Sequence, residues 1–453
     1  MSDFVLEPLD KKQKRYSVAF NEFCGTDAGV SAKRLLAQES INCDYQKGVL
    51  SAGLGVERYV KNRKNIPSKE KASRFFIVDN SGALDSSPDT TFFCLLEGGE
   101  LYRYNESTQT YVYQLGASPY SQMVCIADES GKTMALLSSD EEYFVYENGG
   151  WRCMDFPGAT VAMCACKDRV FLALQNGAIA YSDPTYPAYF VKNAGGGKIQ
   201  LAYHFGEIVA MVVFENQVYV FHQYGVARMR VTGDVESFDV QHLDYVGGEI
   251  YGTSVGVCGN AIFFLAADGV YRFDGSKFSR VENAGIVAPK ADAKLCRFSV
   301  CGDKYILQYV DIDGLSRAVA IAADGKSGYF ISEREGLSYS GGVALCQADG
   351  YVCILRENAE LPTAEQARFV TQRTDFGVSG RKTLRKLRVR GRGLVAMTVT
   401  ADGSQKEYAL SFHQGVASVD TCLLGESFYF SFVLGKNACV QEVAADFSVT
   451  KGG

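Results

Sequence analysis

Residues that commonly bind metals or carry catalysis are few in this sequence and widely spaced. The four histidines include no pair at i, i+4 and none beside a cysteine cluster: His204, His222, His242 and His413. A zinc ion needs three or four ligands, which usually come from close pairs. The spacing therefore predicts structural histidines and no metal site.

Acidic and glycine-rich segments do not indicate an active site either. Asp140-Glu141-Glu142 stands at a predicted turn, where a carboxylate caps the backbone or is solvated. The Asp-box order of sialidases is matched only in part by residues 322–330, and Gly195-Gly196-Gly197-Lys198 lacks the spacing of a Walker loop. We therefore expect no enzymatic activity and no cofactor.

The fourteen cysteines are spread from Cys24 to Cys439, and no pair has CxxC spacing. The N-terminus lacks a secretion signal, and no apolar run reaches the roughly 18 residues of a membrane helix. Synthesis in a reducing cytoplasm is the expected origin, so cysteine would serve as a small buried apolar residue. This predicts free thiols and no membrane segment.

Basic residues are concentrated in one segment. The formal net charge is −6, whereas residues 368–392 contain nine basic residues and one acidic residue, a local charge of +8. Within residues 382–393, Lys386, Arg388, Arg390 and Arg392 alternate with apolar residues or glycine. On a β-strand this alternation places the four basic side chains on one face. A solvated face, or ion pairs with the acidic remainder of the chain, is one interpretation, and a functional interface is the other.

Turn signals indicate the elements that carry these residues. Asn-Gly and Asp-Gly pairs tolerate the positive φ angles of type I′ hairpin turns, and they separate runs rich in β-branched and aromatic residues. Eight such pairs begin at Asn148, Asn176, Asp268, Asp274, Asp313, Asp324, Asp349 and Asp402. Helical periodicity appears only at residues 31–40, with a single turn expected at 364–369. The sequence predicts an all-β protein.

An aromatic hairpin recurs along the chain. The final aromatic residues of five similar segments, Tyr104, Tyr146, Tyr181, Phe221 and Phe273, are 42, 35, 40 and 52 residues apart. This is the length of a four-stranded blade, so we expect a β-propeller of six or seven blades, with a string of β-sandwiches as the alternative. The single tryptophan does not support WD or kelch repeats. The expected domains are an N-terminal arm (1–45), the propeller (46–365) and a C-terminal β-strand module (366–453).

Two segments resemble the tail-hub, or nozzle, proteins of short-tailed bacteriophages, which are also called packaged-DNA stabilisation proteins. One is residues 268–278, Asp-Gly-Val-Tyr-Arg-Phe-Asp-Gly-Ser-Lys-Phe, and the other is residues 371–377, Thr-Gln-Arg-Thr-Asp-Phe-Gly, followed by Lys382 and a strand. The resemblance implies a structural virion protein that forms a ring of six below the phage portal and adaptor. It also implies that the C-terminal β-strand module (366–453) forms ring or tube contacts. Such a ring continues the DNA channel and helps to retain and eject the genome.

The resemblance also implies an interpretation of the basic face. The side chains of Lys386, Arg388, Arg390 and Arg392 would line the channel, where they contact DNA phosphates without reading bases, or a seam between subunits. Other tail proteins would be partners, and the protein would reside in the virion tail. The alternatives are a carbohydrate-binding propeller and a propeller that serves as a scaffold for other proteins. Phage, host, blade count and oligomer number stay open at this point.

Overall fold

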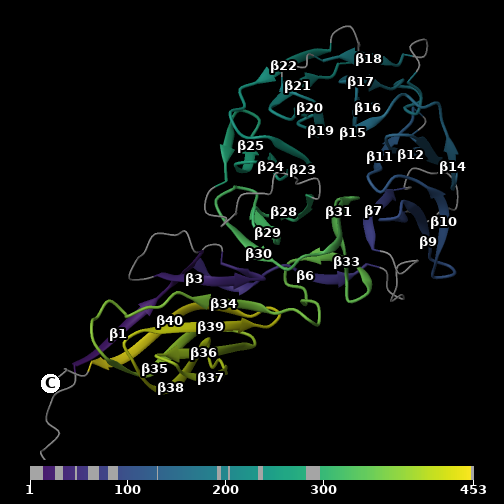
Figure 1. Cartoon of the computed structure of the whole chain (residues 1–453). Coiled ribbons are helices and arrows are strands. Elements are labelled where there is room, and N and C mark those ends of the chain that lie inside the picture. Colours follow the sequence, from purple (N-terminus) through teal and green to yellow (C-terminus); the bar gives the residue numbers. More distant parts are fainter. Residues whose placement is uncertain are drawn as a thin grey trace, which may run out of the picture. The chain divides into compact units, whose positions relative to one another are not determined.

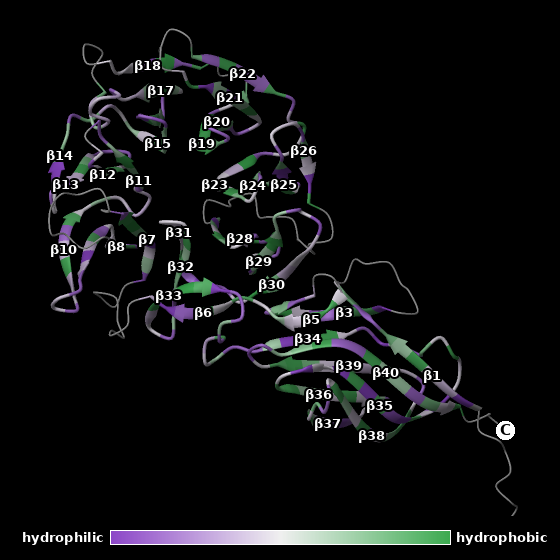
Figure 2. Cartoon of the chain, turned by 180° about the vertical axis from the view of Figure 1, so that it is seen from behind, coloured by the Kyte–Doolittle hydropathy of each residue, from purple (hydrophilic) through white to green (hydrophobic). Residues whose placement is uncertain are grey.

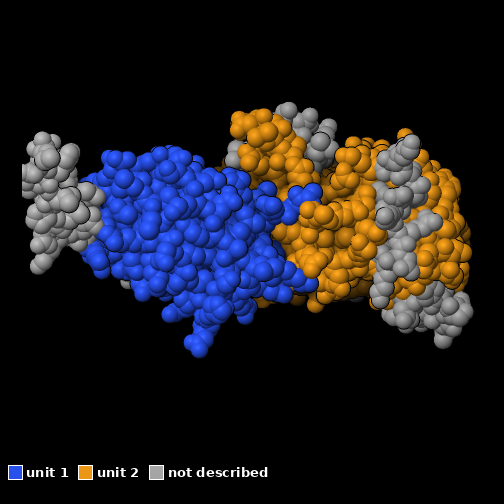
Figure 3. All heavy atoms as spheres, turned by 90° about the horizontal axis from the view of Figure 1, so that it is seen from below, with its two compact units in different colours: residues 1–53, 364–453 blue, residues 54–363 orange. Residues whose placement is uncertain are grey.

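The computed structural model describes residues 14–25, 34–45, 48–59, 71–79, 90–129, 131–190, 195–201, 205–232, 238–281 and 296–449. These ranges form forty β-strands and no α-helix. No helix in the described ranges is long and apolar enough to cross a membrane. The chain divides into two compact units, residues 54–363 and residues 1–53 with 364–453, which Figure 3 colours separately.

Residues 54–363 form a seven-bladed β-propeller, built from seven four-stranded antiparallel sheets. In blades 1 to 6 the innermost strand is the first strand of the blade in the sequence, and the innermost strand of blade 7 is β31. Each innermost strand contacts the innermost strand of the next blade. Figure 1 shows β7, β11, β15, β19, β23 and β31 around the centre of the ring. The blades were expected to number six or seven, and the strand pairing gives seven.

The strands of the first four blades are these, each blade given from its inner to its outer strand. Blade 1 has β7 (Ala72–Asp79), β8 (Thr90–Leu96), β9 (Glu100–Asn105) and β10 (Thr110–Gly116); blade 2 has β11 (Gln122–Ala127), β12 (Thr133–Ser138), β13 (Tyr143–Glu147) and β14 (Gly150–Cys153). Blade 3 has β15 (Thr160–Cys166), β16 (Arg169–Leu174), β17 (Ala178–Tyr181) and β18 (Gly197–Gln200); blade 4 has β19 (Ile208–Phe214), β20 (Gln217–His222), β21 (Gly225–Arg230) and β22 (Asp239–Leu243).

The remaining three blades follow the same order. Blade 5 has β23 (Ile250–Cys258), β24 (Ala261–Ala266), β25 (Gly269–Phe273) and β26 (Phe278–Arg280); blade 6 has β27 (Arg297–Cys301), β28 (Lys304–Val310), β29 (Ser316–Ala322) and β30 (Gly328–Ile331). Blade 7 has β31 (Glu335–Ser340), β32 (Val343–Ala348), β33 (Tyr351–Arg356) and β6 (Gly55–Arg58).

Blade 7 closes the ring with a strand from the other end of the unit. β6 precedes blade 1 in the sequence, yet it pairs with β33 as the outermost strand of blade 7. Gly55 is required at this seam, because a Cβ atom there would lie 2.4 Å from the Ala359 carbonyl oxygen. The closure joins the start and the end of the propeller without a covalent link.

The hydrophobic core lies between neighbouring blades. The second strand of a blade is buried on both faces, as in β16 and β24, whereas outermost strands such as β14 and β22 are mostly exposed. Figure 2 shows the same gradient from hydrophobic inner strands to more hydrophilic outer ones. Between blades 5 and 6, Phe263 stacks on Tyr305 with ring centroids 5.1 Å apart, and both rings are fully buried. A single blade cannot bury both of its faces, so the packing requires the ring.

One member of the aromatic repeat occupies a different place from the others. Four of the five aromatic residues lie on the third strand of their blades: Tyr104, Tyr146, Tyr181 and Phe273. The fifth, Phe221, lies on β20, the second strand of blade 4. This shift accounts for the uneven spacing of 40 and 52 residues on either side of Phe221.

The Asn-Gly and Asp-Gly pairs form turns of two kinds. Both residues have positive φ angles, as type I′ requires, at the pairs that begin at Asn148, Asp349 and Asp402. At the other five pairs only the glycine does, so the prediction of type I′ is wrong there. At Asp274 the side chain instead accepts hydrogen bonds from the N–H groups of Ser276 and Lys277, which fixes a turn without a positive φ at the aspartate.

The second unit consists of two six-stranded sheets. The first sheet contains β38 (Val416–Gly425), β35 (Lys382–Arg392), β40 (Cys439–Val449), β5 (Leu50–Ala52) and β4 (Cys43–Asp44), with β1 (Lys14–Phe20) also paired to β40. The other contains β2 (Glu22–Cys24), β3 (Arg34–Ile41), β34 (Ala367–Thr371), β39 (Phe428–Leu434), β36 (Val395–Ala401) and β37 (Ser404–Leu410). Phe376 stacks on Phe428 of one sheet and on Phe447 of the other, so the sheets form a sandwich.

The N-terminal segment differs from the expected arm. β1 pairs with β40 along seven residues, and β3 pairs with β34, so the described part of residues 1–45 belongs to the same compact unit as the C-terminal strands. The predicted helix at residues 31–40 is wrong, because residues 34–41 form a strand. Three consecutive apolar residues, Leu35, Leu36 and Ala37, are buried there, and a register shift between Ala37 and Glu39 disturbs the alternation. The helical turn expected at 364–369 is likewise replaced by the start of β34.

Candidate functional site

The basic face predicted from the sequence lies on β35, which pairs with β38 on one side and β40 on the other. Lys386, Arg388, Arg390 and Arg392, here called the basic row, are all exposed. Leu387 and Val389 between them are fully buried toward the other sheet. The basic row therefore lies on the outer face of one sheet of the sandwich, on the strand next to β38 at the end of the strand order.

Acidic residues on the neighbouring strands partly neutralise the basic row. Lys386 stands opposite Asp420 on β38 and opposite Asp446 on β40. An Nη atom of Arg388 lies 3.1 Å from the Asp446 carboxylate, and the two side chains are 50% and 34% exposed. Arg390 faces Glu442 across the strands. Ion pairs this exposed stabilise a fold by at most about 1 kcal/mol, so they leave the row free to exchange partners.

The positive charge is least compensated at the C-terminal end of the row. Arg392 stands opposite Cys439 on β40, and the pairing with β38 ends at Arg390. Among the described residues, no ion pair is formed by Lys386, Arg390 or Arg392. The row therefore has two distinct ends, one beside carboxylates and one that presents a guanidinium without a facing acid.

Two other basic residues of the segment have roles that sequence alternation did not reveal. A register shift between Leu384 and Lys386 turns Arg385 to the exposed face as well, where its Nε atom donates to the Ser448 hydroxyl over 3.1 Å. Lys382 is fully buried, and its Nζ atom donates to the carbonyl oxygens of Gly380 and Glu426. Burial lowers the pKa of Lys382. A β-bulge leaves no simple mark in a sequence, which is why Arg385 was missed.

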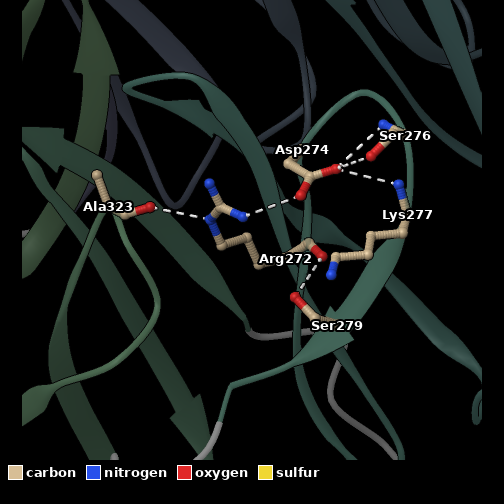
Figure 4. A network of polar contacts seen from close by, with 6 residues as sticks. All are labelled: Arg272, Asp274, Ser276, Lys277, Ser279 and Ala323. Atoms are coloured by element: carbon tan, nitrogen blue, oxygen red, sulfur yellow. Dashed lines mark hydrogen bonds and ion pairs between the residues drawn. The ribbon is translucent and has the colours of Figure 1, made fainter.

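The motif at 268–278 has a structural role in blade 5. The Asp274 carboxylate accepts hydrogen bonds from the hydroxyl and N–H of Ser276 and from the N–H of Lys277, and its other oxygen faces Arg272 (Figure 4). The hydrogen bonds, with Arg272 nearby, hold the pKa of Asp274 at about 2. Arg272 also donates from Nε to the Ala323 carbonyl oxygen of blade 6 over 3.0 Å. The motif thus stabilises a turn in blade 5 and a hydrogen bond between blades 5 and 6.

A second aspartate of the motif also supports the backbone. Asp268 accepts the Tyr271 hydroxyl proton over 2.6 Å and the N–H of Gly248 over 2.8 Å. Burial alone would raise the pKa of Asp268, but these hydrogen bonds together lower it.

The order Gly-x-Ser-x-Gly, which is typical of nucleophile elbows, occurs at residues 252–256, so the expectation that the sequence lacks this order is wrong. Here the serine lies within strand β23 and not at a strand-to-helix turn. The Ser254 hydroxyl is fully buried, donates to the Tyr251 carbonyl oxygen and accepts the N–H of Leu265. These two hydrogen bonds lie where the pairing of β23 with β24 shifts register, between Tyr251 and Gly256.

Histidines and cysteines do not gather in the described structure. His204 lies outside the described residues, and His222 is buried with Nδ1 at 3.0 Å from the Gly206 carbonyl oxygen. In the ranges described, no group of three or more His, Cys, Asp or Glu residues is placed to hold a metal ion. All fourteen cysteines are free, and nine of them are buried. Burial raises the pKa of Cys258 and of Cys296 to about 12, which suits their role as apolar core residues.

No known family model and no curated protein sequence matches the chain. Solved structures similar to it include U3-55K and the WD40 repeats of RRP9, each with a TM-score of 0.41 and 10% identity. Both similarities cover 67% of this chain, and they cover 98% of U3-55K and 96% of the RRP9 chain. The computationally designed Ika8 protein has a TM-score of 0.39 and 13% identity, over 71% of this chain and 98% of that one. The blade count given above comes from the strand pairing of this chain alone.

Proposed function

We propose that this protein is a structural scaffold that assembles with acidic protein surfaces through the basic row of its sandwich. The single observation that carries this proposal is the row itself, four exposed cations on β35, which is the second strand in the order of its sheet. Carboxylates beside the row show that this face accommodates acidic side chains at hydrogen-bond distance, as Asp446 does with Arg388.

A second copy of the chain is an acidic partner of this kind. Residues 368–392 have a local charge of +8, and the whole chain has a net charge of −6. The remaining residues therefore carry −6 − 8 = −14. A basic face on one copy and an acidic surface elsewhere on the next form a heterologous contact, which closes into a ring when the rotation between copies allows it. Complementary charge accelerates encounter and fixes the orientation of such contacts.

The test is light scattering and native mass spectrometry of the wild type and of a variant with Lys386, Arg388, Arg390 and Arg392 changed to Gln. We expect an oligomer at low salt that dissociates as salt screens the contact, and a monomer for the variant. A control variant removes the same charge at other exposed positions, with Lys198, Lys277, Lys326 and Lys436 changed to Gln. Equal assembly of both variants would contradict the proposal, and glycan-array binding by a monomer would favour a carbohydrate-binding propeller.

The second candidate is a tail hub of a short-tailed phage, as the resemblance of residues 268–278 and 371–377 implies. The uncompensated end of the row at Arg392 favours this candidate, because a cation without a facing acid is available to DNA phosphates. Six copies would place the twenty-four cations of the basic row around a channel in the virion tail, six of them at Arg392 without a facing acid. The distinguishing measurement is the salt dependence of DNA binding: a ring of six whose affinity falls steeply with salt supports a hub, and a ring that ignores DNA supports a protein scaffold.

A further inference from the structure

The outermost strand of blade 1 is a long sheet edge with a neighbour on one side. β10 stands at the end of the strand order of its sheet, and among the described strands it pairs with β9 alone. It lies at the rim of the ring in Figures 1 and 2. β10 has seven residues, whereas the outermost strands of the other blades have three to five. An edge strand presents the N–H and C=O groups of every second residue away from its neighbour, where another strand can bind them.

β10 lacks the charged residues that commonly protect such edges. No Lys, Arg, Asp or Glu occurs between Ser107 and Ala127. The outermost strands of five other blades each contain at least one charged residue: Arg58, Arg152, Lys198, Asp239 and Arg280. The outermost strand of blade 6, β30, is uncharged, but three of its four residues are buried. Because charge on an edge opposes pairing with another chain, β10 is the least protected of the seven described edges.

The side chains of β10 suit a further strand. Its first four residues are β-branched or aromatic, the types that favour strands. Val112 is 39% exposed and Tyr113 is 54% exposed. The ring of Tyr113 packs edge-on against Tyr102 of β9, and Tyr111 packs in the same way against Tyr104, with ring centroids 5.7 and 5.2 Å apart. These contacts hold the hairpin in order, so the edge is formed before a partner binds.

A glutamine side chain donates to backbone oxygens of this strand. The pairing of β10 with β9 shifts register between Tyr113 and Leu115, which leaves Gln114 outside the ladder. The Gln114 Nε2 atom donates to the carbonyl oxygens of Val112 over 3.0 Å and of Tyr113 over 3.1 Å. Both hydrogen bonds are exposed to solvent, so the amide can give way to the backbone N–H groups of another strand at little cost.

The absence of charge favours a second copy of this chain as the partner. When two identical strands pair antiparallel about a two-fold axis, residues near the axis lie close to their own copies, and a charged residue there meets a like charge. Among the seven described outermost strands, β10 is the exposed one that avoids this repulsion. In a pairing centred on β10, the two copies of Val112 lie within about two residues of each other.

We propose that β10 pairs antiparallel with β10 of a second copy, so that the four-stranded sheets of two blades 1 become one continuous sheet. The contact uses the same strand on both copies, so it stops at two. One strand pair buries less surface than the interface of a stable dimer, and the contact therefore forms at high protein concentration. It is uncharged and does not involve the basic row.

The experiment isolates this contact from assembly through the basic row. The variant with Lys386, Arg388, Arg390 and Arg392 changed to Gln, a monomer in dilute solution, is followed by sedimentation velocity as its concentration is raised. We expect a monomer–dimer equilibrium without larger species. High salt should not weaken it, because no ion pair forms the contact. Hydrogen exchange should slow at the amides of β10 as the dimer forms, and it should not change at those of β22.

Substitutions at Val112 test the two-fold geometry. Val112→Lys and Val112→Glu, each made in the same background, should weaken association at least tenfold, because like charges meet near the axis. An equal mixture of the two variants should form the dimer again, since unlike charges then face each other. Gln200→Lys is the matched control: it adds the same charge at an exposed position on the outermost strand of blade 3 and should leave association unchanged.

Four results would overturn the proposal. They are a monomer at every concentration, growth beyond two copies, equal association of Val112→Lys and Gln200→Lys, and slowed exchange away from β10. A monomer that nevertheless binds a synthetic peptide of residues 108–116 would show that the edge accepts a foreign strand in place of a second copy. If the Val112 variants do not fold, the exchange measurement decides. If the background variant does not fold, the wild type at high salt provides the same test.

Discussion

The hydroxyl of Ser338 in blade 7 accepts a hydrogen bond from the N–H of Phe75 in blade 1 over 3.0 Å, across 263 residues of sequence. The same hydroxyl donates to the Gly336 carbonyl oxygen over 2.7 Å, and Ser340 accepts the N–H of Ile77 over 2.8 Å. On the other side of blade 7, the Ser299 hydroxyl donates to the Ser338 carbonyl oxygen. Serine side chains therefore join the inner strands of blades 6, 7 and 1, where no backbone ladder runs between blades.

Removal of this hydroxyl should loosen the ring. We expect Ser338→Ala to lower the free energy of unfolding by about 1–3 kcal/mol, because the buried N–H of Phe75 loses its acceptor. Urea unfolding followed by tyrosine fluorescence measures the change. Ser107→Ala, at an exposed turn in blade 1, is the control and should change stability by less than about 0.5 kcal/mol. Equal effects of the two substitutions would contradict this role of Ser338.

The closing strand provides a second prediction. Gly55→Ala should displace β6 from β33, because its Cβ atom would lie within 2.6 Å of two backbone carbonyl oxygens, those of Ala359 and Glu360. We expect a loss of at least about 2 kcal/mol and faster hydrogen exchange at the amides of β6 and β33. Gly150→Ala is the control, since nothing lies within 4 Å of its added Cβ atom. Unchanged exchange in Gly55→Ala would show that the seam tolerates the side chain.

Acid should weaken the turn at Asp274. The pKa of this carboxyl is about 2 in the folded protein against an ordinary value of 3.8, so its contribution to stability is present above about pH 4 and is lost as the pH falls through 2. We expect Asp274→Ala to cost about 1–2 kcal/mol at pH 7 and progressively less below pH 4. Urea unfolding of both proteins across this range measures the difference. A difference that does not depend on pH would mean that the charge of Asp274 contributes nothing.

Thiol accessibility gives a fourth prediction. Denatured protein without reductant should react at all fourteen cysteines, since none is bonded to another. In the native protein Cys153 and Cys422 should react first, because both are exposed. Cys125 is also exposed, but burial of its thiol group raises its pKa to about 11, so it should react more slowly. Timed reaction with a thiol reagent, followed by peptide mass spectrometry, identifies the sites. A denatured count near zero would contradict both the free thiols and synthesis in a reducing compartment.

Much of the architecture could be predicted from local sequence signals, because turn chemistry and strand alternation act over a few residues. The pairs at Asn148, Asp349 and Asp402 form the expected turns, and Lys386 to Arg392 alternate as expected. Prediction failed where long-range pairing decides the outcome. Residues 34–41 form a strand because β34 pairs with them from more than 300 residues away. Phe75 of blade 1 and Ser338 of blade 7 meet only because the ring closes, so no local pattern marks that pair.

The pairing of β1 with β40 has a consequence for protein synthesis. The propeller can close once β33 has left the ribosome, because its partner β6 is already present. The sandwich cannot be completed then, since β1 must wait for a strand made more than 400 residues later. At ribosomal speeds of 5–20 residues per second, this delay is roughly 20–80 s. During that time apolar residues such as Phe20, Phe23 and Leu35 are made but lack their final cover, so nascent chains are most exposed to chaperones and proteases at their N-terminal strands.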